Sequence, residues 1–486
     1  SCTFIRNVNS PTSGGTAVIS SFTCPGSSVG TLLPGVAASG VTQIISANVD
    51  AVGSYSLSTN TVNGVTFTGS DTFSSTGNSQ SITLTATGIP LASGTFTYTL
   101  NACSFTITVG CPGIITGRLV DTPIGAVKTF SINAPVAGNL ILFSNQMAYN
   151  DDKIKSIFSQ MFLDGAPTTF SENGIPGHSV ENRYQSIPNY TTVPVTAGNH
   201  TVTIKANADV LGLSGHTIEY MFVPDCLPSA NKITSGKIIG TDYTSQFSAL
   251  SNPLPAFNLT FTNPGKLILL PTLCFASRAY PSSPGFSQAS YTYDIMVNNT
   301  KVGNALQSYA NRESRWQMLP GLAVADIPAG NSAVNLVPLA GSGSTLFNDP
   351  NDRVLSARLN WIYVPATATV TTGILSAAEG QLAASTSSQS FTLIAPSKGK
   401  FVLLGQASLW QNSVAAGLEY KVKNGLTDLA VVNLNTWHPE GVWQTLPFAT
   451  ELSVAGAGPV TIDYVPTPGK FISFGQCKLL WIFIAE

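Results

Sequence analysis

The chain has 486 residues, a formal net charge of −2 and charged side chains at only 9% of its positions. So little charge excludes the basic patch with which proteins bind nucleic acids or membrane surfaces, and we expect no nucleic-acid partner. Its 43 glycines and 30 prolines favour many turns and few helices, and hydrophobic residues at 43% of positions exclude a disordered chain. The longest apolar stretches are too short to span a membrane, so we expect no membrane insertion.

Residues 1–112 predict an all-β domain, a β-sandwich of immunoglobulin-like character. Polar and apolar residues alternate in SYSLSTNTVNGVTFTG at 54–69, where Asn63-Gly64 is typical of a hairpin turn. The alternation continues through SQSITLTATG at 79–88 and GTFTYTLNACSFTITVG at 94–110. One face of each predicted strand is therefore apolar and the other is rich in Thr and Ser, which is the pattern of a two-sheet core.

Residues 24–110 also resemble a tandem repeat of large secreted surface proteins of Bacteroidota. The resemblance rests on a Gly-x-Tyr strand, the hairpin VNGVTF, the strand ITLTATGIP and the final strand CSFTITV. It implies an extracellular stalk or adhesin, in which Cys24 and Cys103 bracket the sandwich.

The first residues, SCTFIRNV, copy the pattern of the CSFTITV strand. We therefore expect residues 1–10 to be the last strand of a preceding repeat, or a strand that completes a neighbouring fold by strand addition. Cys2 would then be left for an upstream partner, and residues 1–8 would be ordered and paired in a sheet. A coincidental strand is the alternative.

Three long repeats follow, which we place at residues 113–227, 228–366 and 367–486. Each opens on a glycine and a strand, continues with a glycine and an apolar run, and ends on an aromatic-rich strand. Between the last two landmarks each repeat carries the motif aromatic-Gln-x-(Leu/Ile)-Pro. We expect its aromatic residue to anchor a strand in the core and its proline to end that strand; an exposed platform for stacking sugars is the alternative. The motif residues are Tyr184, Gln185 and Pro188, then Trp316, Gln317 and Pro320, then Trp443, Gln444 and Pro447.

Apolar runs bounded by Gly and Pro, at about eight strands per repeat, predict three tandem jelly rolls. Their order resembles the jelly rolls of tumour-necrosis-factor and complement heads and of phage fibres, over residues 113–486. Because jelly rolls of that type often form trimers, the resemblance implies a compact three-lobed head, with an end-to-end rod as the alternative.

No sequence motif of an enzyme or of a cofactor site is present, and we expect neither catalysis nor a cofactor. A carboxylate pair that meets in space, as in glycoside hydrolases, stays open. The chain has four histidines, which we expect on loop or strand surfaces; His438 and Glu440 lie close together but lack a third ligand. Two acidic clusters suit calcium or solvated turns, and they are Asn150 to Asp152, and Asp349 with Asn351 and Asp352.

The seven cysteines indicate an oxidising compartment, so we expect an extracellular protein, secreted or on a cell surface. Cys111 and Cys226 bracket the first jelly roll, whose first and last strands are neighbours, and can form a disulfide. Cys274 and Cys477 lie beside core strands of different repeats, where we expect free buried thiols.

Together these features favour a non-enzymatic adhesin or a subunit of an extracellular appendage. Its expected partners are other copies of itself or surface and appendage proteins, with a glycan or a cell-surface receptor as ligand. A phage or injection-system fibre and a secreted carbohydrate-binding protein are the alternatives.

Overall fold

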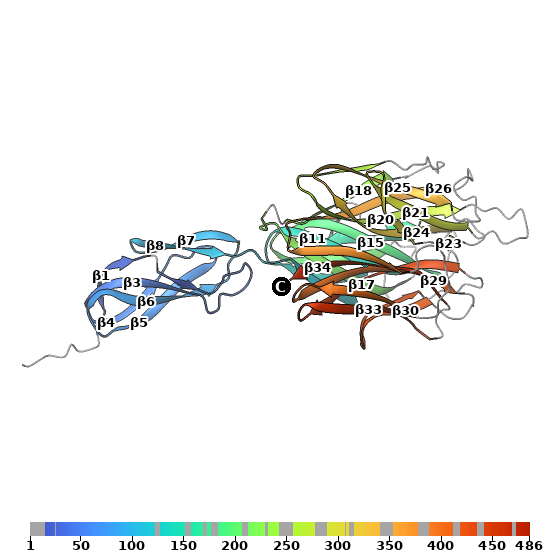
Figure 1. Ribbon diagram of the computed structural model, residues 1–486. Helices are drawn as coiled ribbons and strands as arrows, with labels where there is room; N and C mark the ends of the chain where they lie inside the picture. Colours follow the sequence, from blue (N-terminus) through green and yellow to red (C-terminus); the bar gives the residue numbers. More distant parts are fainter. Residues whose placement is uncertain are drawn as a thin grey trace, which may run out of the picture.

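The structure is a computed structural model in which every regular element of the described residues is a β-strand, β1 to β34 (Figure 1). The all-β prediction is therefore confirmed. The described residues are 15–24, 26–121, 127–150, 157–168, 173–175, 183–206, 212–228, 232–242, 256–277, 289–306, 308–310, 315–340, 353–377, 388–411, 418–434, 442–468 and 473–486.

The N-terminal strands form a separate β-sandwich, at the left of Figure 1, which meets the rest of the chain at one end. A six-stranded sheet, in the order β1-β3-β6-β5-β4 with β2 beside β3, packs against the hairpin β7-β8 around one apolar core. Asn63 and Gly64 have positive φ angles and form the predicted turn before β5. The strands are β1 (Val18–Thr23), β2 (Ser28–Val29), β3 (Thr42–Ala51), β4 (Gly53–Ser58), β5 (Val65–Phe73), β6 (Gly77–Gly88), β7 (Gly94–Leu100) and β8 (Cys103–Val109).

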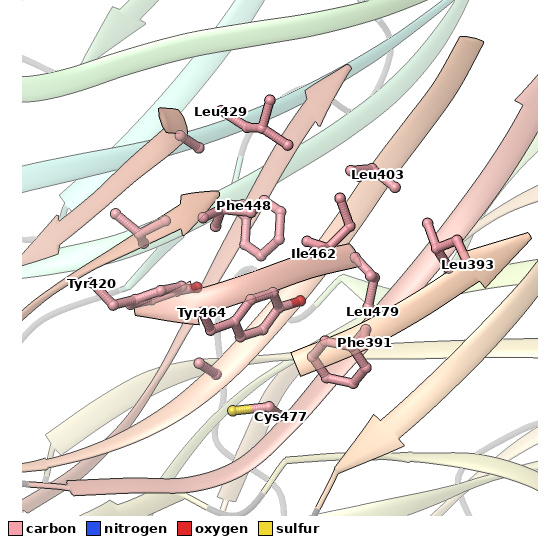
Figure 2. Packing of buried hydrophobic residues seen from close by; sticks show 14 of the residues in the cluster. Phe391, Leu393, Leu403, Tyr420, Leu429, Phe448, Ile462, Tyr464, Cys477 and Leu479 are labelled. Carbon is pink, nitrogen blue, oxygen red and sulfur yellow. The ribbon is translucent and has the colours of Figure 1, made fainter. Parts of the chain in front are cut away.

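The last eight strands show the jelly-roll topology most simply. They form two four-stranded sheets, β27-β34-β29-β32 and β28-β33-β30-β31, so that the first strand pairs with the last. Figure 2 shows the core between the two sheets, where Tyr420 and Tyr464 lie among aliphatic and aromatic side chains. The strands are β27 (Val370–Ala377), β28 (Gln389–Ala395), β29 (Gly399–Gln411), β30 (Leu418–Asn424), β31 (Thr427–Leu434), β32 (Val442–Val454), β33 (Gly458–Pro466) and β34 (Ser473–Ala485).

The first repeat has the same topology, with sheets β15-β11-β17-β9 and β10-β16-β12-β13, and β14 beside β12. Its strands are β9 (Ile115–Asp121), β10 (Val127–Ala134), β11 (Gly138–Asn150), β12 (Ile157–Leu163), β13 (Ala166–Pro167), β14 (Asn173–Ile175), β15 (Arg183–Val195), β16 (Gly198–Ala206) and β17 (Gly212–Pro224).

In the second repeat the two halves join through β24 and β22 into one nine-stranded sheet, in the order β18-β26-β20-β24-β22-β21-β25-β19 with β23 beside β21. Its strands are β18 (Thr234–Asp242), β19 (Phe257–Phe261), β20 (Gly265–Ser277), β21 (Ala289–Val297), β22 (Thr300–Ala305), β23 (Ser308–Ala310), β24 (Arg315–Ile327), β25 (Gly330–Ala340) and β26 (Arg353–Pro365).

A glycine opens each repeat because an aromatic ring of the last strand lies over it. Gly236 pairs with Trp361, and a Cβ atom on this glycine would lie 2.5 Å from the indole ring. Gly117 with Tyr220, and Gly373 with Trp481, repeat the arrangement. The opening glycine and the closing aromatic strand, two of the landmarks in the sequence, are thus two halves of one contact.

The aromatic-Gln-x-(Leu/Ile)-Pro motif begins β15, β24 and β32, and its proline does not end the strand. Each of these strands has 13 residues and continues seven residues beyond the proline, so the sequence prediction was wrong here. Proline is tolerated because β15 and β32 each pair with one neighbour only, while the pairing of β24 with β22 stops just short of Pro320.

The buried anchor of the motif in the described residues is its aliphatic residue, Ile187, Leu319 or Leu446, each at most 1% exposed. Tyr293 and Tyr420 donate their hydroxyl protons to the carbonyl oxygens of Leu319 and Leu446, at 3.1 and 3.0 Å. The side chains of the motif's aromatic and glutamine residues lie outside the described residues, so their predicted roles stay predictions.

Candidate functional site at the shared axis of the three repeats

One sheet of each repeat turns its outer face toward the other two repeats. We call these the axial sheets: β9-β17-β11-β15, β18-β26-β20-β24 and β27-β34-β29-β32. Their facing side chains form one apolar cluster drawn from all three repeats, and Figure 1 shows the repeats gathered side by side. The structure therefore has the compact head and not the rod. The buried members include Ile141, Phe143, Tyr190 and Met221, then Ile268, Leu270, Leu322 and Ile362, then Val402, Leu404, Leu480 and Ile482.

The three repeats contact one another in a closed ring. Strand β15 of the first repeat contacts β18 of the second, β24 of the second contacts β27 and β34 of the third, and β32 of the third contacts β9 and β17 of the first. Each contact joins the same kind of strand to the same kind of neighbour, so the contacts are head-to-tail and the ring closes after three. The chain thus has a pseudo-threefold axis.

The three equivalent contacts differ in chemistry. Between the first and second repeats, the hydroxyl oxygens of Thr192 and Ser235 lie 2.7 Å apart. Between the second and third, Val324 and Ile374 pack against the shared apolar cluster. A polar contact joins the third repeat to the first, where the Nδ2 of Asn145 donates to the carbonyl oxygen of Pro447 at 2.8 Å.

A charged group stands at this third contact. Arg118 of β9 lies 3.0 Å from Glu219 of β17 and donates across the contact to the Leu429 carbonyl oxygen and to the Thr450 hydroxyl. Glu219 is 2% exposed. Burial raises the pKa of Glu219 to about 9 despite the opposing charge of Arg118, and the charge of Glu451 adds to the rise. Burial thus favours the neutral form of this carboxyl group.

Next to the apolar cluster, one layer of the axis has polar side chains from all three repeats. Asn145, Thr272 and Gln406 occupy equivalent positions of β11, β20 and β29, two residues beyond the axial residues Phe143, Leu270 and Leu404. Alternate residues of a strand share a face, so these three side chains point to the axis. Gln406 is 0% and Thr272 is 2% exposed.

The amide atoms of Gln406 and the hydroxyl of Thr272 have no hydrogen-bond partner among the described residues. Leaving such a group without a partner costs about 1–3 kcal/mol. In the same layer, Lys478 is 3% exposed and donates to the backbone carbonyl oxygen of Asn304 at 2.7 Å and to its side-chain oxygen. This axial polar layer joins the second and third repeats.

A groove of about 430 Å³ lies where the sandwich meets the first repeat. Asp225 at its rim pairs with Lys232 at 2.6 Å, and Leu91 of the sandwich is 68% exposed beside it. Its lining is mostly small and apolar: Leu91, Ala92, Ser93, Val136, Ala137, Ala197, Asp225 and Cys226.

The structure contains both disulfides that were expected from the sequence. Cys24 is bonded to Cys103, and Cys111 to Cys226. Cys477 is a free, buried thiol, as predicted, and burial raises its pKa.

Most of the remaining candidates lie outside the described residues. This is true of residues 1–14 with Cys2, of His438 and Glu440, and of Asp151 and Asp152. It is also true of the calcium candidates Asp349, Asn351 and Asp352, and of the side chains of Asn150 and Cys274. In the part of the chain that the structure describes, no group of three or more His, Cys, Asp or Glu residues could hold a metal ion. The same part of the chain has no helix with the length and hydropathy that a membrane span requires.

His200 is buried, contrary to the surface position expected from the sequence. Its Nδ1 lies 2.7 Å from Asp164 and its Nε2 lies 2.8 Å from the Thr196 carbonyl oxygen. Burial lowers the pKa of His200, but the hydrogen bonds with Asp164 and Thr196 outweigh it and raise the pKa overall. The hydrogen bond from His200 lowers the pKa of Asp164. The pair fixes the β12–β13 turn to β16.

Sequence reasoning missed the axial polar layer and the Arg118 group. The signal was present, because Asn145, Thr272 and Gln406 each follow the apolar run of their repeat at the same distance from its glycine. Such a layer is indicated where a polar residue takes the position at which the pattern of the strand predicts a buried apolar residue. The pairing of Arg118 with Thr450, 332 residues away, has no signal in the local pattern.

Fold and site define a class: an all-β chain of one sandwich and three jelly rolls that share an axis. No family model and no protein of curated function matches the chain. Among solved structures, PNGF-II is 10% identical at a TM-score of 0.27, over 71% of this chain and 84% of that chain. A protein of the triple jelly-roll fold and turret assembly of an archaeal virus is 10% identical at a TM-score of 0.18, over 81% of this chain and 88% of that chain. Likenesses this weak carry no argument about function.

Proposed function

We propose that the chain is a non-enzymatic extracellular protein, an adhesin or an appendage subunit, in which the N-terminal sandwich is a stalk and the three jelly rolls form a binding head. The observation that carries the proposal is the shared apolar cluster, to which all three repeats contribute. A cluster of this kind makes one rigid body of three domains.

The strand directions give this head two distinct ends. The axial strands β11, β20 and β29 begin at the end that meets the stalk, since Gly138 pairs with Pro224 beside Cys226. Their 13 residues run for roughly 43 Å at 3.3 Å per residue. The ends of the strands at Asn150, Ser277 and Gln411 therefore stand together, far from the stalk. A stalk at one end and three grouped strand ends at the other suit the presentation of a binding surface.

Two further features support an extracellular location. The two disulfides persist in an oxidising compartment, and one of them closes the junction between stalk and head. The low charge of the chain favours contact with neutral partners, such as other copies of itself, surface proteins or glycans.

Immunogold electron microscopy of the producing organism, with antibodies to the head, tests this function. We expect label on the cell surface or on surface appendages. Label confined to the cytoplasm would contradict the proposal, and label on virions would favour the fibre of a phage. The purified chain assayed on glycans should release no reducing sugar; release that depends on the folded chain would contradict the non-enzymatic role.

A further inference from the structure

We propose that the axial polar layer binds a small inorganic anion, such as a halide, at the pseudo-threefold axis. The proposal concerns the head alone and does not depend on its extracellular role. It rests on two buried side chains without partners and on the charge of the layer that surrounds them.

The first observation is the pair of unsatisfied side chains. Gln406 is fully buried, and neither its amide nitrogen nor its amide oxygen has a hydrogen-bond partner among the described residues. Thr272 is 2% exposed, and its hydroxyl also has no hydrogen-bond partner among the described residues. Buried polar groups in folded proteins are nearly always paired, with ordered water or an ion where protein atoms do not serve. Two unpaired groups at equivalent positions of two repeats indicate a shared occupant.

The second observation is the sign of the charge. Residues directly opposite each other in paired strands share a face, and Thr272 stands opposite Arg358, while Gln406 stands opposite Lys478. The four strands of each axial sheet contribute twelve positions to this layer, and neither Asp nor Glu occurs at any of these twelve. These positions are Val120, Thr217, Asn145 and Pro188, then Ile239, Arg358, Thr272 and Pro320, then Ser376, Lys478, Gln406 and Pro447.

The layer thus offers the Thr272 hydroxyl and the Gln406 amide N–H as donors, and two cationic side chains stand at the positions opposite them. A small anion accepts from several donors at once, which suits this set. A cation would find the side-chain oxygens of Asn145, Thr272 and Gln406, but beside two positive charges that disfavour it. The glutamates nearest along the axial strands, Glu219 and Glu451, lie one and two layers away.

Two measurements on the full chain test the proposal. Crystals soaked in bromide should show an anomalous peak within hydrogen-bond distance of Gln406 and Thr272. Thermal unfolding in chloride, compared with gluconate at equal ionic strength, should show a melting temperature about 2–4 °C higher in chloride. Thr272→Val should abolish this difference, while the matched control Thr272→Ser, which keeps the hydroxyl, should retain it.

A bromide peak at the layer and a chloride effect that Thr272→Val removes would support the site. An anomalous map without a peak there, including one that shows only ordered water, would overturn it. So would a chloride effect of equal size in both variants. If Thr272→Val does not fold, the anomalous map of the unaltered chain decides alone.

Discussion

Leu404 and Leu403 are neighbours on β29 that face opposite sides of the axial sheet. Leu404 belongs to the cluster shared by the three repeats, and Leu403 belongs to the core of the third repeat alone (Figure 2). Both side chains are at most 1% exposed. Substitution of each by alanine is therefore a matched pair that separates the shared core from the core of one repeat.

The two substitutions remove the same three carbon atoms. At about 0.8 kcal/mol per buried methylene, the lost transfer free energy is about 2.4 kcal/mol, and the cavity raises the loss to about 3 kcal/mol. A loss of this size raises the equilibrium constant for opening of the strands to solvent by a factor of about 150. The two variants differ in which core loses stability, because only Leu404 belongs to the cluster that all three repeats share.

Amide hydrogen exchange followed by mass spectrometry locates the effect. In Leu404→Ala we expect faster exchange in β11, β20 and β29, up to about 150-fold where opening is local. In Leu403→Ala we expect faster exchange in β28 to β34, with β11 and β20 unchanged. If Leu404→Ala accelerates exchange in the third repeat only, the shared core does not couple the repeats and the reasoning fails.

Three further substitutions test single contacts. His200→Gln should lower the free energy of unfolding most between about pH 4 and 6.5, as denaturation at a series of pH values measures. The stabilisation by the His200–Asp164 pair is lost as the pH rises through the raised pKa of His200. It is also lost as the pH falls through the lowered pKa of Asp164. Glu219→Gln should change the free energy of unfolding little at acidic pH. From pH 4.5 to about 9 the unaltered chain should lose stability because the pKa of Glu219 is raised, while the variant should not. Equal slopes of unfolding free energy against pH in the two proteins would contradict this. Gly236→Ala should cost about 1–3 kcal/mol in denaturant unfolding, since its Cβ would meet the Trp361 ring at 2.5 Å, and an unchanged midpoint would refute the contact.

The sequence predicted the parts of the fold that are written as local patterns. Alternation and turn residues such as Asn63-Gly64 predicted the strands, and four landmarks repeated in the same order predicted three similar domains. The disulfide Cys111–Cys226 followed from the rule that the first and last strands of a jelly roll are neighbours. Each of these depends on residues close in sequence or on a topology rule.

The sequence did not predict what depends on the third dimension. A proline in a strand reads as a stop, and only the position of β15 and β32 at sheet edges shows why the strands continue through Pro188 and Pro447. The bond from Asn145 to Pro447 joins residues 302 apart in the chain, which no periodicity reveals. The axial polar layer, similarly, becomes visible only when three strands are placed around one axis.

Small-angle X-ray scattering of the full chain tests the central claim, that three jelly rolls form one head beside a single stalk, most directly. A domain whose strands have 13 residues is roughly 43 Å long. A stalk followed by a compact head then has a maximum dimension near two domain lengths, about 90 Å, and this is the result we expect. A maximum dimension near four domain lengths, about 170 Å, would show an end-to-end rod and would contradict the shared axis.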